Sequence, residues 1–189
     1  MRTAPASFEA RYRETPDPWA FADAPYERAK YARTIAALGG RRFGRALELG
    51  CANGELTALL APACDTLVAL DAAPTAVARA TTRLAGLDTV VVRRGVIPED
   101  LPAGPCDLIV ASEILYYLGP ELLETTVARA VAGLAPGGVL LAVHWTGEAA
   151  SHALGADAVH ARLLADPSLR ARVAERHAGY RLDLLERLP

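Results

Sequence analysis

Two acidic residues follow short apolar segments in the first half of the sequence. Glu48 stands two residues before Gly50, and Asp71 ends the apolar run 67–70. In open α/β sheets, ligands bind at the carboxyl ends of the strands, where glycine lets them approach the backbone. A carboxylate at Asp71 can accept hydrogen bonds from two ribose hydroxyls, whereas one at Glu48 attracts a cation and repels a pyrophosphate. The two acids therefore describe a ligand with a ribose, a positive charge and no phosphate.

The loop between these acids excludes two other nucleotide classes. A GxGxxG dinucleotide motif is absent because Ala52 and Glu55 stand where the second and third glycines belong, and no Gly-Lys-Ser/Thr of a P-loop follows. S-adenosyl-L-methionine has a ribose, a positive charge and no phosphate, and we expect it as cofactor. The residues expected around it are Glu48, Gly50, Cys51, Gly54, Asp71, Ala72, Gly95, Val96 and Ser112, with Tyr12 and Trp19 as an aromatic lid.

A second group of polar residues follows two later apolar segments. One segment ends just before Glu113, with Tyr116 in the same loop, and the other ends at His144. Methyl transfer from a sulfonium requires alignment of the acceptor with the methyl group and the handling of one proton. We predict that Glu113 orients an ammonium group or His144, and that His144 acts as a base. The structural alternatives are a capping acid, a strand-end histidine and a core tyrosine.

The elements that must position these residues alternate between apolar runs and helical segments, which is typical of βαβ units. Strands are expected at 46–49, 67–70, 90–92, 108–111, 139–143 and 180–187, and helices at 26–38, 55–60, 74–84, 121–134, 157–164 and 168–177. A loop or single turn is expected over 94–105, and a turn at 136–138. Runs buried on both faces indicate a mostly parallel sheet with helices on both faces. We predict a Rossmann-like α/β fold with strand order 3-2-1-4-5 and a sixth, antiparallel strand at the edge.

Length and charge restrict the organisation and the partners. At 189 residues the chain has the length of one domain, in which we expect a cover over 1–40, a cofactor-binding core over 41–146 and C-terminal elements over 147–189. The formal net charge of -2 gives no broad positive field, so no nucleic-acid partner is expected. The sequence has neither a signal peptide nor an apolar run of membrane length, so we expect a cytoplasmic protein without a membrane partner.

The cysteines and histidines do not have the spacing of a metal site. Cys51, Cys64 and Cys106 are far apart and match neither a disulfide framework nor a CxxC pattern, which predicts free thiols. The remaining histidines, His152, His160 and His177, are interpreted as surface or helix residues without chemistry. No metal is expected.

Four motifs in this order resemble a known family. They are Asp17-Pro18-Trp19 with Tyr26-Glu27 and Lys30-Tyr31, then Glu48-Leu49-Gly50-Cys51, then the segment 107–118 with Ser112-Glu113 and Tyr116-Tyr117-Leu118, and finally His144-Trp145. Together they resemble the NodS-like group of class I methyltransferases, named for a nodulation N-methyltransferase. Ala52 departs from the wider superfamily, in which a middle glycine is usual. The resemblance implies the class I methyltransferase fold, S-adenosyl-L-methionine as methyl donor and, in the namesake, a deacetylated amino-sugar oligosaccharide as acceptor.

The expected activity is methylation of a small polar metabolite. We favour N-methylation of an amine on a sugar-like acceptor such as an amino sugar, a nucleoside or a similar molecule, by a monomer or homodimer. O-methylation of a sugar, nucleoside or small-acid hydroxyl, with His144 as base, is one alternative. A non-catalytic module that binds an adenosine ligand is another. An NAD-linked oxidoreductase is disfavoured by Glu48 and Ala52.

Overall fold

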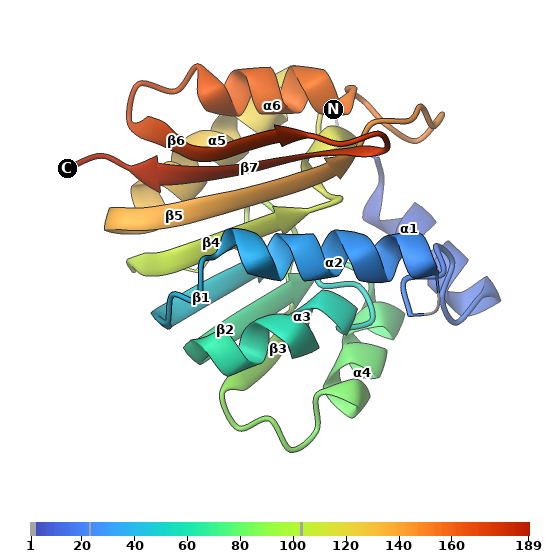
Figure 1. Cartoon of the computed structure of the whole chain (residues 1–189). Coiled ribbons are helices and arrows are strands. Elements are labelled where there is room, and N and C mark those ends of the chain that lie inside the picture. Colours follow the sequence, from blue (N-terminus) through green and yellow to red (C-terminus); the bar gives the residue numbers. More distant parts are fainter. Residues whose placement is uncertain (1–2, 23, 103) are drawn as a thin grey trace. The chain divides into compact units, whose positions relative to one another are not determined.

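The structure is a computed structural model that describes residues 3–22, 24–102 and 104–189. Positions 1, 2, 23 and 103 lie outside the described residues. The first three belong to the expected cover over 1–40, and position 103 belongs to the expected connection over 94–105. The backbone forms two compact units, Ala4–Val96 and Ile97–Pro189, the second of which includes Thr3. The helices and strands of both units are labelled in Figure 1, and the predicted single-domain organisation stays a prediction.

The unit Ala4–Val96 contains three parallel strands in the order β3-β2-β1. Its elements are α1 (Pro5–Glu14), α2 (Pro25–Ala37), β1 (Phe43–Leu49), α3 (Glu55–Leu60), η1 (Ala61–Ala63), β2 (Cys64–Asp71), α4 (Pro74–Arg83) and β3 (Val90–Arg94). Proline begins α1, α2 and α4, where its fixed φ suits the first turn and its missing N–H is not needed. The register pairs Leu49 with Leu70 and Asp71 with Arg94, so the three strands end at one edge.

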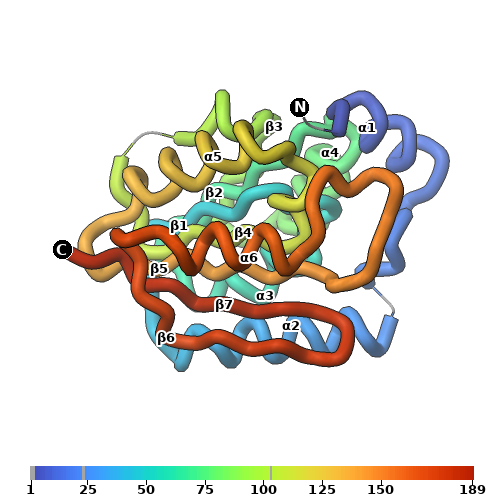
Figure 2. The backbone as a smooth tube through the Cα atoms, turned by 90° about the horizontal axis from the view of Figure 1, so that it is seen from above, coloured from blue at the N-terminus to red at the C-terminus, as the bar shows by residue number. Residues whose placement is uncertain are grey.

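The unit Ile97–Pro189 contains four strands in the order β4-β5-β7-β6. Its elements are β4 (Cys106–Ser112), η2 (Leu115–Tyr117), α5 (Pro120–Gly133), β5 (Leu134–Trp145), α6 (Ala156–Leu164), β6 (Leu169–Arg176) and β7 (Tyr180–Arg187). β4 and β5 are parallel, and β7 pairs antiparallel with β5 on one side and with β6 on the other. Helix α6 packs against these last three strands, as the view from above shows (Figure 2).

The complete strand order is β3-β2-β1-β4-β5-β7-β6. The predicted mostly parallel Rossmann-like sheet, its order 3-2-1-4-5 and its late antiparallel strand are therefore confirmed. The sheet has one strand more than predicted, and β7 is not its edge, because β6 covers it.

The additional strand is the main error in the predicted elements. The segment 168–177 was expected to be helical, but Leu169–Arg176 forms β6. Its alanine, arginine and glutamate residues favour a helix, yet Leu169 is buried while most of its neighbours are exposed, as in a half-buried strand. Pairing with β7 therefore overrides the local helix propensity.

Smaller differences concern the ends of elements. Helix α1 was not predicted, and β5 begins at Leu134, so it runs through the expected turn at 136–138. The three cysteines are free, as predicted, and the structure shows that they are also buried. Among the described residues, no helix has the length and apolar character needed to cross a membrane.

Candidate functional site

Glu48 lies near the end of β1 and is almost completely buried. Its Oε2 accepts a hydrogen bond from the Thr57 hydroxyl at 2.6 Å. Burial raises the pKa of Glu48 to about 7, the Thr57 hydrogen bond opposes this, and the charge of Asp71 adds to it. A buried carboxyl group that titrates near neutrality favours its charged form when a cationic group binds beside it.

This buried carboxyl group makes the stability of the protein depend on pH. Between an unfolded pKa near 4.5 and a folded pKa of about 7, the folded state holds a proton that the unfolded state has lost. The free energy of unfolding should therefore fall as pH rises through this window, by about 3 kcal/mol, and then stay constant. Glu48→Gln should remove this decrease, because glutamine keeps the oxygen that accepts from Thr57 and does not titrate.

Urea unfolding of both proteins from pH 4 to pH 8.5 tests this prediction. The difference in unfolding free energy between the variant and the wild type should grow in favour of the variant as pH rises. A difference that is independent of pH would show that the pKa of Glu48 is the same in the folded and unfolded states.

The loop after β1 depends on glycine at Gly54. Gly54 has a φ of 84° and precedes α3, and a Cβ there would lie 3.1 Å from Leu84 Cδ1 and 3.3 Å from Ala80 Cα. Left-handed backbone is unfavourable for L-residues with a side chain. The glycine therefore allows the loop to approach α4 closely.

Gly54→Ala should destabilise the protein by about 2 kcal/mol, from backbone strain and the close contacts. Gly133→Ala is the matched control, because a Cβ at Gly133 meets nothing within 4 Å. Since alanine is favoured over glycine in helices, the control should be neutral or slightly stabilising. Equal urea midpoints for Gly54→Ala and the wild type would contradict the prediction.

Asp71 ties together the two loops at the end of the sheet. Its Oδ2 accepts from the Ala52 N–H at 2.9 Å, and its Oδ1 accepts from the Ala73 N–H at 2.8 Å. Burial raises the pKa of Asp71, and hydrogen bonds from the backbone of Ala73, Ala52 and Ala72 oppose this rise. The Gly95 N–H donates to the Asp71 carbonyl oxygen at 2.9 Å. The structure therefore brings Asp71, Ala72 and Gly95 together, as the cofactor prediction requires.

Ala52 adopts a left-handed backbone conformation in this loop, and its contacts explain why alanine is tolerated there. Ala52 has a φ of 52°, a value that favours glycine. Its N–H is held by Asp71, and its side chain packs against a buried cluster. These contacts offset the strain of a non-glycine residue. Gly50, with a φ of 73°, and the buried Cys51 complete the turn.

The predicted aromatic lid lies beside these loops. Tyr12 is buried with Ala73 and Ala76, and Phe8, Trp19 and Ala52 pack against this cluster. The rings of Tyr12 and Trp19 meet edge to face with centroids 5.4 Å apart. Tyr12 and Trp19 therefore contact the same loops that Asp71 holds.

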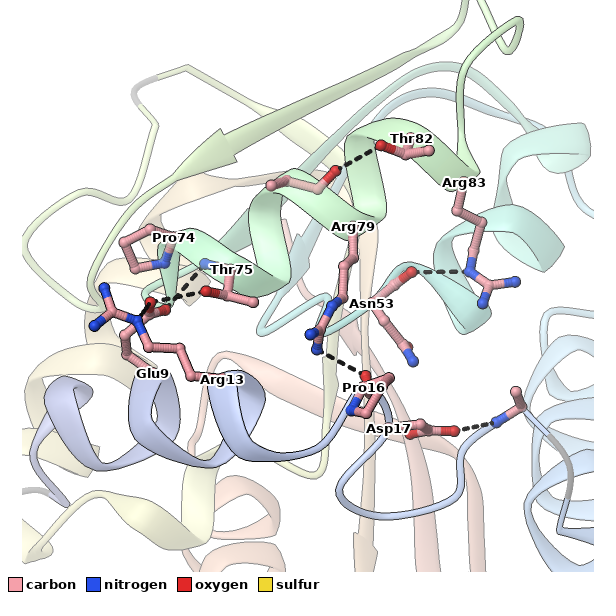
Figure 3. A pocket seen from close by; sticks show the side chains of 12 residues that line it. Glu9, Arg13, Pro16, Asp17, Asn53, Pro74, Thr75, Arg79, Thr82 and Arg83 are labelled. Atoms are coloured by element: carbon pink, nitrogen blue, oxygen red, sulfur yellow. Dashed lines mark hydrogen bonds and ion pairs between the residues drawn. The ribbon is translucent and has the colours of Figure 1, made fainter.

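An open pocket of about 950 Å³ lies beside the glycine loop (Figure 3). Asn53 belongs to its lining, together with residues of α1 and α4, among them Arg13 and Arg79. The Arg79 guanidinium donates to the Pro16 carbonyl oxygen at 2.9 Å, which connects α4 to the segment after α1. Glu48 and Asp71 do not line this pocket, so it is distinct from the strand-end acids.

In the unit Ile97–Pro189, Glu113 is held in a fixed conformation after β4. It has a φ of 55°, and its N–H donates to the Val143 carbonyl oxygen at 2.8 Å. Its Oε2 accepts from the Tyr116 hydroxyl at 2.5 Å and from the Trp145 N–H at 2.9 Å. Burial and the charge of Glu113 raise the pKa of Tyr116, so its phenol stays protonated and donates. Ser112 ends β4 and is partly buried.

His152, which was interpreted as a residue without chemistry, stacks on Tyr116. The two ring centroids are 3.8 Å apart, and the N–H groups of Ala153 and Leu154 donate to the Tyr116 carbonyl oxygen. Burial lowers the pKa of His152, and the charge of Glu113 opposes this. The loop after β5 therefore packs on the Glu113 and Tyr116 segment.

His144 lies in a different environment from the one expected for a base. It is completely buried, and its Nε2 accepts from the Leu115 N–H at 3.1 Å. Its Nδ1 lies 3.0 Å from His160 Nε2, and His160 Nδ1 lies 2.7 Å from Asp183 Oδ2. Because both ring nitrogens are occupied, His144 cannot take a proton from an acceptor without losing a hydrogen bond. In this arrangement both ring nitrogens of His144 have hydrogen-bond partners within the unit, and its role as a base stays a prediction.

His160 lies on helix α6, in agreement with the interpretation of a surface or helix residue, and it is completely buried. Asp183, which is also completely buried, was missed by the sequence analysis. A detectable signal was the acid at position 183 between the apolar residues Leu182 and Leu184. Among residues 3–22, 24–102 and 104–189, no group of three or more His, Cys, Asp or Glu side chains is placed to hold a metal ion.

The strand order, with acids at the ends of β1 and β2, defines the class I methyltransferase fold. A family model described as Nodulation protein S (NodS) matches residues 8–180. The chain belongs to the NodS family.

Similar proteins agree with this assignment. Nodulation protein S of Rhizobium tropici is 37% identical over 131 residues, which are 66% of this chain and 53% of that protein. The chain thus spans about half the length of this curated relative. The solved N-methyltransferase NodS from Bradyrhizobium japonicum WM9, in complex with S-adenosyl-L-homocysteine, is 29% identical with a TM-score of 0.85, covering 97% of this chain and 98% of that one. A solved protein from Pseudomonas syringae is 42% identical with a TM-score of 0.77, covering 86% and 99%.

Proposed function

We propose that the chain is an S-adenosyl-L-methionine-dependent methyltransferase. The observation that carries the proposal is the pair of acids, buried Glu48 and partly buried Asp71, at the ends of neighbouring strands without a phosphate-binding motif between them. The complex of the related NodS with S-adenosyl-L-homocysteine supports the same ligand class. The cofactor supplies an activated methyl group, and the chain's residues bind and orient it.

Each residue of the cofactor site has a proposed role. Glu48 faces the methionine ammonium, and Asp71 accepts hydrogen bonds from the ribose hydroxyls. Gly95 and Val96 border the adenine through their backbone, and Tyr12 and Trp19 exclude water from the methionine end. Cys51 contributes through the loop backbone, because burial raises the pKa of its thiol and keeps it neutral. Ser112 remains a predicted cofactor contact.

We propose that the acceptor is an amine on a small, sugar-like molecule. In the unit Ile97–Pro189, the Glu113 carboxylate is oriented by two donors and attracts a substrate ammonium. The bound ammonium first releases one proton to solvent, and the lone pair of the neutral amine then attacks the methyl group without loss of a further proton during the attack, whereas a hydroxyl needs a base. His144, the base proposed for a hydroxyl, has both ring nitrogens occupied, which favours N-methylation over O-methylation.

Transfer of a labelled methyl group tests the proposal. We expect label from S-adenosyl-L-methionine to appear on glucosamine oligomers, and mass spectrometry of the product should place it on nitrogen. The N-acetylated oligomers are the matched control, since their amide nitrogen is not nucleophilic, and they should stay unlabelled. Equal labelling of both oligomers would indicate O-methylation. Absence of label on any amine, nucleoside or hydroxyl acceptor would favour a binding module.

A further inference from the structure

Three buried polar side chains form a continuous chain in the unit Ile97–Pro189. His144 comes from β5, His160 from α6 and Asp183 from β7, and each is completely buried. The register pairs His144 with Arg181, which is two residues from Asp183, so both β7 residues share the strand face of His144. Helix α6 packs against β5 and β7 (Figure 2). The two hydrogen-bond contacts of the His160 ring place it between His144 and Asp183.

One backbone N–H determines where the ring protons lie. Leu115 donates to His144 Nε2, so this nitrogen carries no proton and the ring proton of the neutral imidazole is on Nδ1. His144 Nδ1–H then donates to His160 Nε2, which places the second ring proton on His160 Nδ1. That proton is donated to Asp183 Oδ2. All three hydrogen bonds therefore point in one direction, from Leu115 to the carboxylate.

The buried charge of Asp183 has a nearby counter-charge. Arg181 Nη2 lies 3.5 Å from Asp183 Oδ2, and Arg181 Nη1 lies 3.2 Å from Asp157 Oδ1 on α6. Asp157 also forms an ion pair with Arg176 of β6. A buried carboxylate is costly unless it is paired and hydrogen-bonded, and Asp183 Oδ2 is both, whereas Oδ1 is buried without a hydrogen-bond partner among the described residues. These contacts hold the Asp183 carboxylate in place, so the hydrogen-bonded series His144–His160–Asp183 is fixed at its Asp183 end.

The opposite end of this hydrogen-bonded series is the Leu115 N–H, which lies in the segment that contains Glu113 and Tyr116, the residues proposed for the acceptor site. Leu115 lies between Glu113 and Tyr116, whose side chains are hydrogen-bonded to each other, and the Tyr116 ring meets the His144 ring edge to face at 5.2 Å. Glu113 has left-handed backbone, which persists only where surrounding contacts hold it. The hydrogen bond from Leu115 to His144 is one of these contacts.

We propose that His160 and Asp183 are positioning residues, which fix the tautomer of His144 and thereby hold the segment 113–116 in the geometry that presents the Glu113 carboxylate. This inference rests on the proposed function for the role of Glu113. The hydrogen-bonded series His144–His160–Asp183 transfers no proton to an acceptor. It keeps His144 Nε2 permanently available to the Leu115 N–H.

The first test is a nitrogen-15 spectrum of the wild-type protein, in which two-bond couplings distinguish protonated from unprotonated ring nitrogens. We expect both His144 and His160 to carry their proton on Nδ1. This readout needs neither cofactor nor acceptor, so it is independent of the proposed function and of any variant. A proton on His144 Nε2 would overturn the proposal.

The second test is Asp183→Asn, with His177→Gln as control. The asparagine amide can donate to His160 as well as accept, so the tautomer is no longer fixed. We expect faster hydrogen exchange at the Leu115 amide and a kcat reduced between about 10-fold and 100-fold, with S-adenosylhomocysteine affinity within about twofold of wild type. His177, which bonds Glu175 and is partly exposed, should change neither quantity on substitution. Unchanged Leu115 exchange, or an unchanged kcat with faster exchange, would contradict the positioning role.

Discussion

Asp71→Ala is expected to weaken the binding of S-adenosylhomocysteine by at least about 100-fold. The substitution removes the proposed acceptor of two ribose hydrogen bonds, and hydrogen bonds to charged groups contribute about 1.5–3 kcal/mol each. It also releases the Ala52 and Ala73 N–H groups, so the loops at the end of β1 and β2 lose their common anchor. Isothermal titration calorimetry of the purified variant measures the loss.

Asp65→Ala is the matched control for this prediction. Asp65 lies on the same strand, β2, but is exposed and pairs with Arg42. Its removal should change the affinity by less than about twofold, since exposed ion pairs contribute little. If the two variants bound the ligand equally well, Asp71 would be a structural acid and not a ribose ligand.

Glu113→Gln is expected to reduce kcat for amine acceptors by about 100-fold while leaving the affinity for S-adenosylhomocysteine unchanged. The amide keeps the size of the side chain and one oxygen that can accept from Tyr116 and Trp145, but it removes the charge that attracts an ammonium group. The loss belongs to acceptor orientation, for which small displacements have large kinetic effects. Steady-state kinetics with a glucosamine oligomer measure it.

Glu121→Gln provides the control for charge removal in the same unit. Glu121 is an exposed acid in the first turn of α5. We expect its kcat to stay within about twofold of the wild type. A wild-type rate for Glu113→Gln would remove this carboxylate from the acceptor site and leave only its contacts with Tyr116 and Trp145 as its role.

The central strands could be predicted from the sequence because local pattern and tertiary environment agree there. The runs in β1, β2, β4 and β5 are apolar on both faces, and only a covered parallel sheet satisfies such runs. The segment of β6 has no such agreement. Its composition favours a helix, and its strand conformation depends on pairing with β7, which a local reading cannot detect.

The proposed cofactor residues and His144 also differ in how far the local sequence predicts their environment. The proposed cofactor residues follow from local sequence, since Glu48, Gly54 and Asp71 stand at fixed intervals on consecutive elements. The environment of His144 cannot be predicted in this way, because it depends on residues distant in the sequence. His160 on α6 lies 16 positions after His144, and Asp183 on β7 lies 23 positions after His160. A histidine at a strand end looks accessible until α6 is seen to cover it.

Calorimetric titration of the wild-type protein with S-adenosylhomocysteine, run beside a titration with NADH, tests the central claim most directly. The proposed function predicts micromolar binding of S-adenosylhomocysteine and no binding of NADH, because buried Glu48 favours an ammonium and opposes a pyrophosphate. Binding of NADH, or the absence of heat with S-adenosylhomocysteine, would contradict the assignment of the strand-end acids to S-adenosyl-L-methionine.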